Sequence, residues 1–467
     1  MSQRLCCIAL ALLVATNARA QTDSSLRLTT KSAAAAADFR AGVRDYENLS
    51  FESASAHFKA AITADPAFGL ARVLYAGTSG TLDQSQLEAE VNRGVTDAAK
   101  ASNKELILAS AYKEAILGNA DVANALFRAA AQLMPNDRLL AFAATGGVFA
   151  ANLEAARELV AKYPDYPLGY NSLAYLNWPD DRAAALAAAK RQVELNPTAP
   201  NPHDTYAELL QWNGNFTEAA AHYKEATTLS PKFPEAFVGL AEVAALQGQY
   251  DQARNYLNQA IANSWSPQQR LGYMRQIIGT YALQGDNTNV LKSLEAALAE
   301  AKAERDKRAT AIIYSQIATV QANAAGAGTA HQSIAQSKAA IADLPWNVHF
   351  YYAMAHGLLK HWGPAGQELA ALKAQAEKDD AVPKPMLAAL EGYLLTQQGK
   401  AAEALRVLMA SDTTHLLVMN RIAEAHAALG HRAEAAAWNN RVNSNYAINL
   451  ADFTNVNTRR RARLAVR

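Results

Sequence analysis

The sequence predicts an all-α solenoid, in which helix-turn-helix repeats stack so that each buries its apolar face against its neighbours. Three observations predict this class. Residues of the same kind recur 34 positions apart in the middle of the chain. Alanine carries much of an apolar fraction of 50%, which suits closely packed helices better than strands. Glycine and proline separate the repeated segments, where helices end. The recurring pairs are Ala207 with Ala241, Gly214 with Gly248, Phe216 with Tyr250, Ala219 with Ala253, and Ala226 with Ala260.

The clearest repeat covers residues 201–233 and contains two predicted helices. Tyr206, Ala207 and Leu210 place apolar side chains on one face of the first helix. Gly214 closes this helix, because glycine adopts the left-handed conformation without steric cost. The second helix ends at Pro231, because proline cannot donate the next helical hydrogen bond. Its small and aromatic positions are Ala219, Tyr223 and Ala226.

This packing pattern resembles the tetratricopeptide repeat, a helix-turn-helix of 34 residues whose small, aromatic and proline positions recur. The resemblance implies a right-handed superhelical solenoid. Other copies follow the same spacing around Gly42, Gly118, Gly399 and Gly430. The resemblance therefore covers nearly all of residues 35–443, in roughly ten to twelve repeats. Residues 273–372 keep the register more loosely.

The chain is expected to contain two arrays of repeats. Residues 35–305 form the predicted N-terminal array, and residues 306–445 form a C-terminal array that runs from degenerate to regular repeats. The alanine and glycine stretch at 324–328 is either a loose turn or a break between sub-stacks, and residues 379–385 are a second candidate hinge. The sequence leaves open whether the solenoid is one superhelix or two with a hinge near 320–385.

Residues 446–467 are predicted to be a C-terminal cap and basic tail. Two interpretations remain: a solvated helical cap, as terminal repeats require a polar outer face, or a contact with an anionic surface. The basic side chains are Arg459, Arg460, Arg461, Arg463 and Arg467.

The first twenty residues have the pattern of a signal peptide. Arg4 gives a positive start, residues 5–15 are apolar, and residues 18–20 read Ala-Arg-Ala, the small-x-small pattern that a signal peptidase recognises. The apolar run is shorter than the roughly 20 residues that span a bilayer, which favours cleavage after Ala20 over a retained anchor. We expect an exported protein of bacterial type, periplasmic or secreted, whose residues 21–34 form a flexible leader.

Composition excludes several classes of protein. Both cysteines, Cys6 and Cys7, lie in the predicted signal peptide, so the mature chain has no disulfide, thiolate metal site or cysteine nucleophile. The 44 basic and 43 acidic residues leave no net field of the kind that nucleic-acid binders use. No later stretch is apolar and long enough to cross a membrane.

The sequence shows no motif for catalysis, a cofactor or a metal, so we expect a protein that is not an enzyme. It lacks the paired histidines of zinc proteases, the phosphate-binding loop and the Gly-x-Ser-x-Gly elbow. Seven of ten histidines fall between His331 and His431, but His356 and His361 are five positions apart. On a continuous helix that spacing turns the two rings away from each other, which argues against a metal site.

The resemblance places the first helix of each repeat on the concave surface, where its polar and aromatic residues face a ligand. Acidic residues replace the lysine, arginine and asparagine clamp with which one subclass grips a C-terminal carboxylate. Rings and carboxylates instead suit an extended polypeptide. The candidate groove residues are Tyr170, Asn177, Trp178, Asn201, Asp204, Glu208, Gln211, Trp212, Glu235 and Glu242.

The leading hypothesis is an exported scaffold that binds a protein or peptide partner in its concave groove, in cell-envelope assembly or maintenance. Two alternatives remain. The chain could bind a small molecule or glycan fragment, with Tyr170, Trp178 and Trp212 enclosing it. It could also be an enzyme whose site lies between sub-stacks near residues 320–385. The partner and the oligomeric state are not specified by the sequence.

Overall fold

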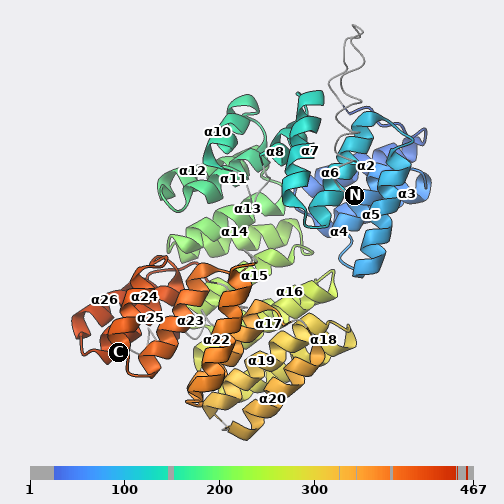
Figure 1. The fold of residues 1–467 in the computed structure, drawn as a ribbon. Coiled ribbons are helices and arrows are strands. Elements are labelled where there is room, and N and C mark those ends of the chain that lie inside the picture. Colours follow the sequence, from blue (N-terminus) through green and yellow to red (C-terminus); the bar gives the residue numbers. More distant parts are fainter. Residues whose placement is uncertain are drawn as a thin grey trace. The chain divides into compact units, whose positions relative to one another are not determined.

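A computed structural model describes residues 26–145, 152–324, 327–342, 344–378, 382–448, 450 and 459–460. These residues form 24 α-helices and contain no strand (Figure 1). The predicted class, an all-α solenoid, is confirmed. The predicted signal peptide, residues 1–20, lies outside the described residues, as do residues 21–25 of the expected leader. None of the helices in the described part of the chain is both long and apolar enough to cross a membrane.

The chain divides into two compact units, and the division falls within α11 (Pro167–Asn177). The first unit contains Met1–Glu47 and Phe51–Ser172, and the second contains Asn48–Ser50 and Leu173–Arg467. The helices of the first unit are α2 (Ala33–Glu47), α3 (Phe51–Ala64), α4 (Gly69–Thr78), α5 (Gln84–Ala98), α6 (Asn103–Ile116), α7 (Ala120–Leu133), α8 (Arg138–Ala144) and α10 (Leu153–Lys162).

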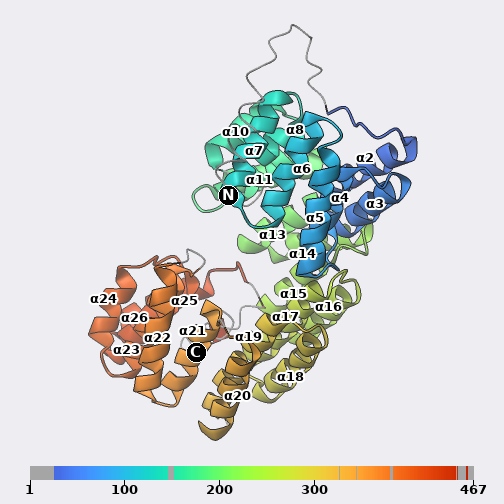
Figure 2. The ribbon, with the colours of Figure 1, turned by 45° about the vertical axis from the view of Figure 1, so that its right-hand side comes forward.

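The second unit is a stack of helical hairpins, with consecutive helices side by side (Figures 1 and 2). Its helices are α12 (Arg182–Leu195), α13 (Pro200–Trp212), α14 (Phe216–Leu229), α15 (Pro234–Leu246), α16 (Tyr250–Ala262), α17 (Pro267–Gln284), α18 (Asn287–Ala303), α19 (Lys307–Ala324), α20 (Ala327–Ala340), α21 (Trp346–Leu358), α22 (Trp362–Ala376), α23 (Lys384–Gln397), α24 (Ala401–Met409), α25 (Leu416–Ala428) and α26 (Arg432–Asn443).

Small residues sit where the paired helices touch. Alanine at these positions lets two backbones approach, while larger side chains fill the space between successive hairpins. Tyr223 and Leu257 are examples of the larger residues, and both are buried. The alanines of the 34-residue period are fully buried, as the packing pattern predicts: Ala207, Ala219, Ala226, Ala241, Ala253 and Ala260.

Residues 26–32, part of the expected flexible leader, lie extended against the first unit. The backbone N–H of Thr29 donates to a carboxylate oxygen of Glu105 at 2.6 Å, and the Thr30 hydroxyl donates to Asp65 at 2.5 Å. Leu26 and Leu28 pack against the core of this unit. These residues are therefore part of the folded unit.

The C-terminal segment returns to the middle of the second unit. The ring of Tyr446 lies edge-on to Phe216 at the start of α14, with centroids 5.1 Å apart. Leu450 is fully buried, and its backbone carbonyl lies against Gly279 of α17. Arg459 is only 2% exposed and donates to the backbone carbonyls of Asn445 and Ala447. Of the two interpretations of the basic tail, a solvated cap does not fit Arg459, which is buried. Residues 451–458 and 461–467 lie outside the described residues.

Candidate functional site

Carboxylates and aromatic rings gather on the first helices of neighbouring hairpins in the second unit. We call this surface the acid face and define it by Asp204, Glu208 and Trp212 on α13, Glu235 and Glu242 on α15, and Trp178 in the turn after α11. Residues four positions apart lie on one side of a helix, which aligns Asp204, Glu208 and Trp212. Stacking of α13 on α15 then brings the two helices' carboxylates together.

Glu242 is held in a buried hydrogen-bond network. The side-chain amide of Gln211 donates to its carboxylate at 3.0 Å, and the Tyr223 hydroxyl donates to the carbonyl oxygen of Gln211 at 3.2 Å. Burial raises the pKa of Glu242 to about 8, against the opposing effect of the Gln211 hydrogen bond. Glu242 therefore holds a proton at neutral pH.

Glu208 and the two tryptophans form the partly exposed part of the acid face. The Tyr175 hydroxyl donates to Glu208 at 2.5 Å. The Trp178 and Trp212 rings meet at 61° with centroids 5.5 Å apart. Such an edge-to-face pair offers a large apolar area while fixing both rings.

Asp204 lies among the other acids. Desolvation raises the pKa of Asp204 well above its usual range, and the charges of Glu208, Glu235 and Glu242 raise it further. Burial also raises the pKa of Glu208, while the Tyr175 hydrogen bond lowers it. A cation or basic group that binds to carboxylates with raised pKa values favours their ionised form. Its binding therefore releases protons from the cluster.

The C-terminal segment supplies groups to this surface. The backbone N–H of Leu450 donates to Glu242, and the charge of Arg459 lowers the pKa of that carboxyl. Leu450 thus lies against α15 and α17, and the charge of Arg459 acts on Glu242 while its guanidinium donates to the Asn445 and Ala447 carbonyls.

Four further candidate groove residues are Asn177, Asn201, Glu235 and Tyr170. Asn177 and Asn201 are buried, and the Asn177 amide donates to the Leu173 carbonyl within α11 at 2.9 Å. Glu235 is exposed and accepts from Gln269 at 3.1 Å. Tyr170 belongs to the first unit, where its hydroxyl donates to the Pro164 carbonyl at 3.1 Å. Their part in binding stays a prediction.

Sequence reasoning missed four groups that shape the acid face: Tyr175, Tyr223, Gln269 and Arg459. The repeat register contained a signal for one of them, since Tyr175 precedes Glu208 by about one repeat length and therefore lies on the neighbouring first helix. Arg459 carried no such signal, because it lies beyond the last repeat.

The expectation that His356 and His361 turn away from each other is wrong. Helix α21 ends at Leu358, and Lys360 adopts a left-handed backbone with φ of 58°. The chain then reverses, so that the His361 N–H donates to the His356 carbonyl at 2.8 Å. This is the hydrogen bond of a helix-ending Schellman turn, and it brings the two rings to 6.2 Å between centroids.

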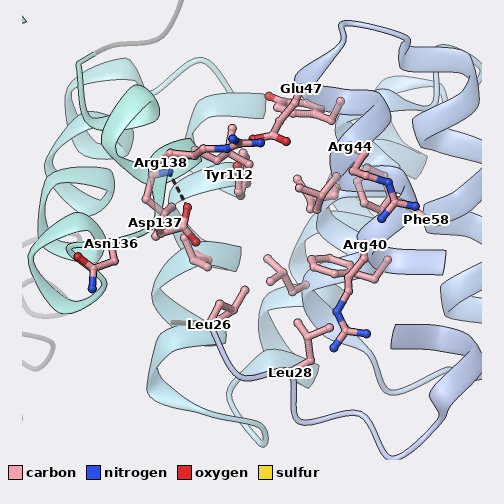
Figure 3. A pocket seen from close by; sticks show the side chains of 18 residues that line it. Leu26, Leu28, Arg40, Arg44, Glu47, Phe58, Tyr112, Asn136, Asp137 and Arg138 are labelled. Carbon is pink, nitrogen blue, oxygen red and sulfur yellow. Dashed lines mark hydrogen bonds and ion pairs between the residues drawn. The ribbon is translucent and has the colours of Figure 1, made fainter. Parts of the chain in front are cut away.

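A second candidate site is a cavity of about 470 Å³ within the first unit (Figure 3). Leucine, phenylalanine and tyrosine side chains form most of its wall, with Leu26 and Leu28 along one side. Glu47 and Arg138 face each other at 3.6 Å in this wall. Burial raises the pKa of Glu47, and the Arg138 charge opposes that shift.

Comparison with known proteins gives one family match. Residues 213–264 match the family model described as tetratricopeptide repeat. No curated protein sequence matches the chain. Among solved structures, TTC0263, a thermophilic tetratricopeptide repeat protein of Thermus thermophilus, is 25% identical with a TM-score of 0.31, covering 34% of this chain and 91% of that one. MamA protein is 16% identical with a TM-score of 0.22, covering 49% of this chain and 91% of that one.

Stacked helical hairpins with polar and aromatic residues on their first helices define an α-solenoid. Residues 213–264 of this chain match the tetratricopeptide repeat. Repeats of this kind generally bind protein partners.

Proposed function

We propose that this protein is a scaffold that binds an extended, basic segment of a polypeptide partner on the acid face, and that it performs no catalytic step itself. One observation carries the proposal. The chain's own C-terminal segment lies on this surface, with the Leu450 N–H on Glu242 and the Arg459 charge beside it. The exposed part of the same helices offers a foreign segment contacts of the same kind.

The partner occupies the partly exposed end of the acid face, beside the C-terminal segment. Trp178, Trp212, Glu208 and Asp204 keep part of their surface exposed, and Glu235 is exposed. Rings supply contact area, while the carboxylates attract arginine or lysine side chains. A basic group there lowers the pKa values of the acids, so binding releases protons.

The N-terminal sequence favours export, so we place the partner in a bacterial cell envelope, where the scaffold serves assembly or maintenance. Cleavage after Ala20 is tested by N-terminal sequencing of the protein from its own cells. A mature chain that begins at Gln21 and fractionates with the periplasm supports this placement. An intact N-terminus in the cytoplasmic fraction contradicts it.

The binding proposal is tested by capture from envelope extract. The bait is the full mature chain, beside an Asp204→Asn, Glu208→Gln, Glu235→Gln variant that removes three charges with little change in shape. A matched control, Glu225→Gln, Glu295→Gln, Glu403→Gln, removes three exposed acids from the second helices of three hairpins. Circular dichroism checks that all three baits are folded.

A partner captured by the native bait and by the control, but lost with the acid-face variant, supports the proposal. Calorimetry in buffers of different ionisation enthalpy then measures the protons released on binding. Equal capture by all three folded baits contradicts a role for the acid face.

The cavity of the first unit favours a second candidate function, the binding of a small amphipathic molecule. A volume of about 470 Å³ is within the usual range of ligand sites, and its apolar wall is bordered by Arg40 and Arg44. Fatty-acid and bile-acid libraries screened by thermal shift test this function. Leu74→Trp, which fills the cavity, should abolish any shift that a true ligand causes.

A further inference from the structure

Three histidines that are distant in sequence come together in the second unit. His331 lies on α20, His356 on α21, and His361 in the turn before α22. One ring nitrogen from each lies within 4.8 Å of the others. The His331 and His361 rings stack with centroids 5.2 Å apart, and His331 and His356 are 5.8 Å apart. Two consecutive hairpins therefore contribute to one cluster.

The central histidine has an unsatisfied polar atom. His356 is 8% exposed, and its Nδ1 is buried without a hydrogen-bond partner among the described residues. A buried imidazole nitrogen without a partner loses the hydration that it had in the unfolded chain, which costs free energy. A metal ion bound through this nitrogen would compensate for that loss.

We propose that His331, His356 and His361 bind a late first-row divalent cation, with Zn²⁺ as the ion of choice. Neutral imidazole is a preferred ligand of Zn²⁺, Ni²⁺ and Cu²⁺, and three histidines with an open fourth position form a common zinc site. Tetrahedral zinc with Zn–N bonds of about 2.0–2.1 Å requires nitrogens roughly 3.3 Å apart. The exposed His331 side chain closes this gap by rotating about its own χ angles.

The surroundings of the cluster suit a cation without supplying a further ligand. The negative charge of Glu368 on α22 acts on His356 and offsets the positive charge of Lys338. Both of its oxygens are engaged, one by Lys338 at 3.0 Å and the other by His349 at 2.6 Å. Exposure of His331 gives the ion a path from solvent and leaves water as the fourth ligand.

The same chain contains a natural control. His426 and His431 flank an equivalent turn around Gly430, where the His431 N–H donates to the His426 carbonyl at 2.9 Å. Their Nδ1 atoms are 3.3 Å apart. No third ligand joins this pair among the described residues. Two histidines alone hold a metal more weakly than three, so the pair should not compete at low metal concentration.

The test uses the full mature chain, prepared without a histidine tag and stripped with a chelator. Equilibrium dialysis against Zn²⁺ measures stoichiometry and affinity, and the visible absorption of bound Co²⁺ reports the coordination geometry. The variants are His331→Asn and His361→Asn, with His426→Asn as the matched control. His331 is exposed, so its replacement leaves the fold intact, which circular dichroism verifies.

We expect one tightly bound Zn²⁺ per chain, a tetrahedral Co²⁺ spectrum and an affinity loss of at least about 100-fold in both cluster variants. His426→Asn should bind as the native chain does. Failure of the native chain to retain the ion overturns the proposal, as does an affinity unchanged by His331→Asn and His361→Asn. A loss with His426→Asn alone places the metal elsewhere and overturns it equally.

Discussion

The backbone N–H of Leu450 donates a hydrogen bond to the carboxylate of Glu242. These two residues are far apart in the chain, one after α26 and the other on α15. Their contact joins the C-terminal segment to the surface on which we expect a partner to bind. It also makes the segment and the acid face depend on each other.

Gly279→Ala should expel the C-terminal segment from the repeats. A Cβ at Gly279 would overlap the Leu450 carbonyl oxygen, a backbone atom that cannot rotate away. Faster tryptic cleavage at Arg459 measures the release. Gly272→Ala on the same helix is the control, because nothing lies within 4 Å of its Cβ. That change should stabilise the protein by about 0.5–1 kcal/mol, since alanine favours helix over glycine. Equal protection of Arg459 from trypsin in both variants would contradict the role of Gly279.

Glu242→Gln should reduce the pH dependence of stability. The folded pKa of Glu242 is about 8 against an ordinary value of 4.5, so between these values the native state holds a proton that the unfolded chain has lost. The free energy of unfolding therefore falls as pH rises through this window. Urea unfolding at about pH 5 and about pH 8 measures the fall, which should be smaller in the variant. An identical fall would show that Glu242 is ionised throughout.

Lys360→Gly should stabilise the protein by about 0.5–1 kcal/mol, because Lys360 holds a left-handed backbone at φ of 58° that glycine adopts without strain. Gly430→Ala is the converse change at the equivalent turn, where φ is 77°. It should destabilise by about 1 kcal/mol. Thermal unfolding of both variants measures the direction of each change in stability. A lower stability of Lys360→Gly than of the native protein would refute the argument.

Tyr175→Phe should destabilise the second unit by about 1.5–3 kcal/mol, the usual value of a hydrogen bond to a charged group, because it removes the donor at 2.5 Å from Glu208. A double-mutant cycle with Glu208→Gln isolates the interaction. A coupling energy near zero would mean that the hydroxyl contributes only its packing. The Trp212 ring, which packs against the Tyr175 ring, is left unchanged in all of these variants.

Local signals predicted most of the fold. Gly214 and Gly248 end their helices with φ of 88° and 79°, as glycine placement in the repeat indicates. Asp181 caps α12 by accepting from the Ala184 N–H at 2.9 Å. An aspartate directly before a helix favours this contact. Short-range steric and hydrogen-bond preferences determine these features, and they are readable from neighbouring residues.

The candidate sites were less predictable, because they depend on where the chain reverses and returns. The register of the repeats placed Glu208 and Glu242 on first helices, but no pattern indicated that Leu450 would lie on Glu242. The His356 and His361 spacing was interpreted on a continuous helix. Lys360 takes the turn position that glycine usually marks, so the reversal that pairs the rings had no signal in the sequence.

Contacts between Leu450 and α15–α17 change how the second unit can be made. A repeat array without such contacts folds from its first hairpins onward while the rest is still being synthesised. Here the contacts at Glu242 and Gly279 form only when Leu450 has left the ribosome, since Leu450 comes after α15 and α17 in the chain. A nascent chain that has not reached Leu450 leaves Glu242 without this N–H donor and Gly279 without its backbone neighbour, so the second unit is incomplete until Leu450 has been added.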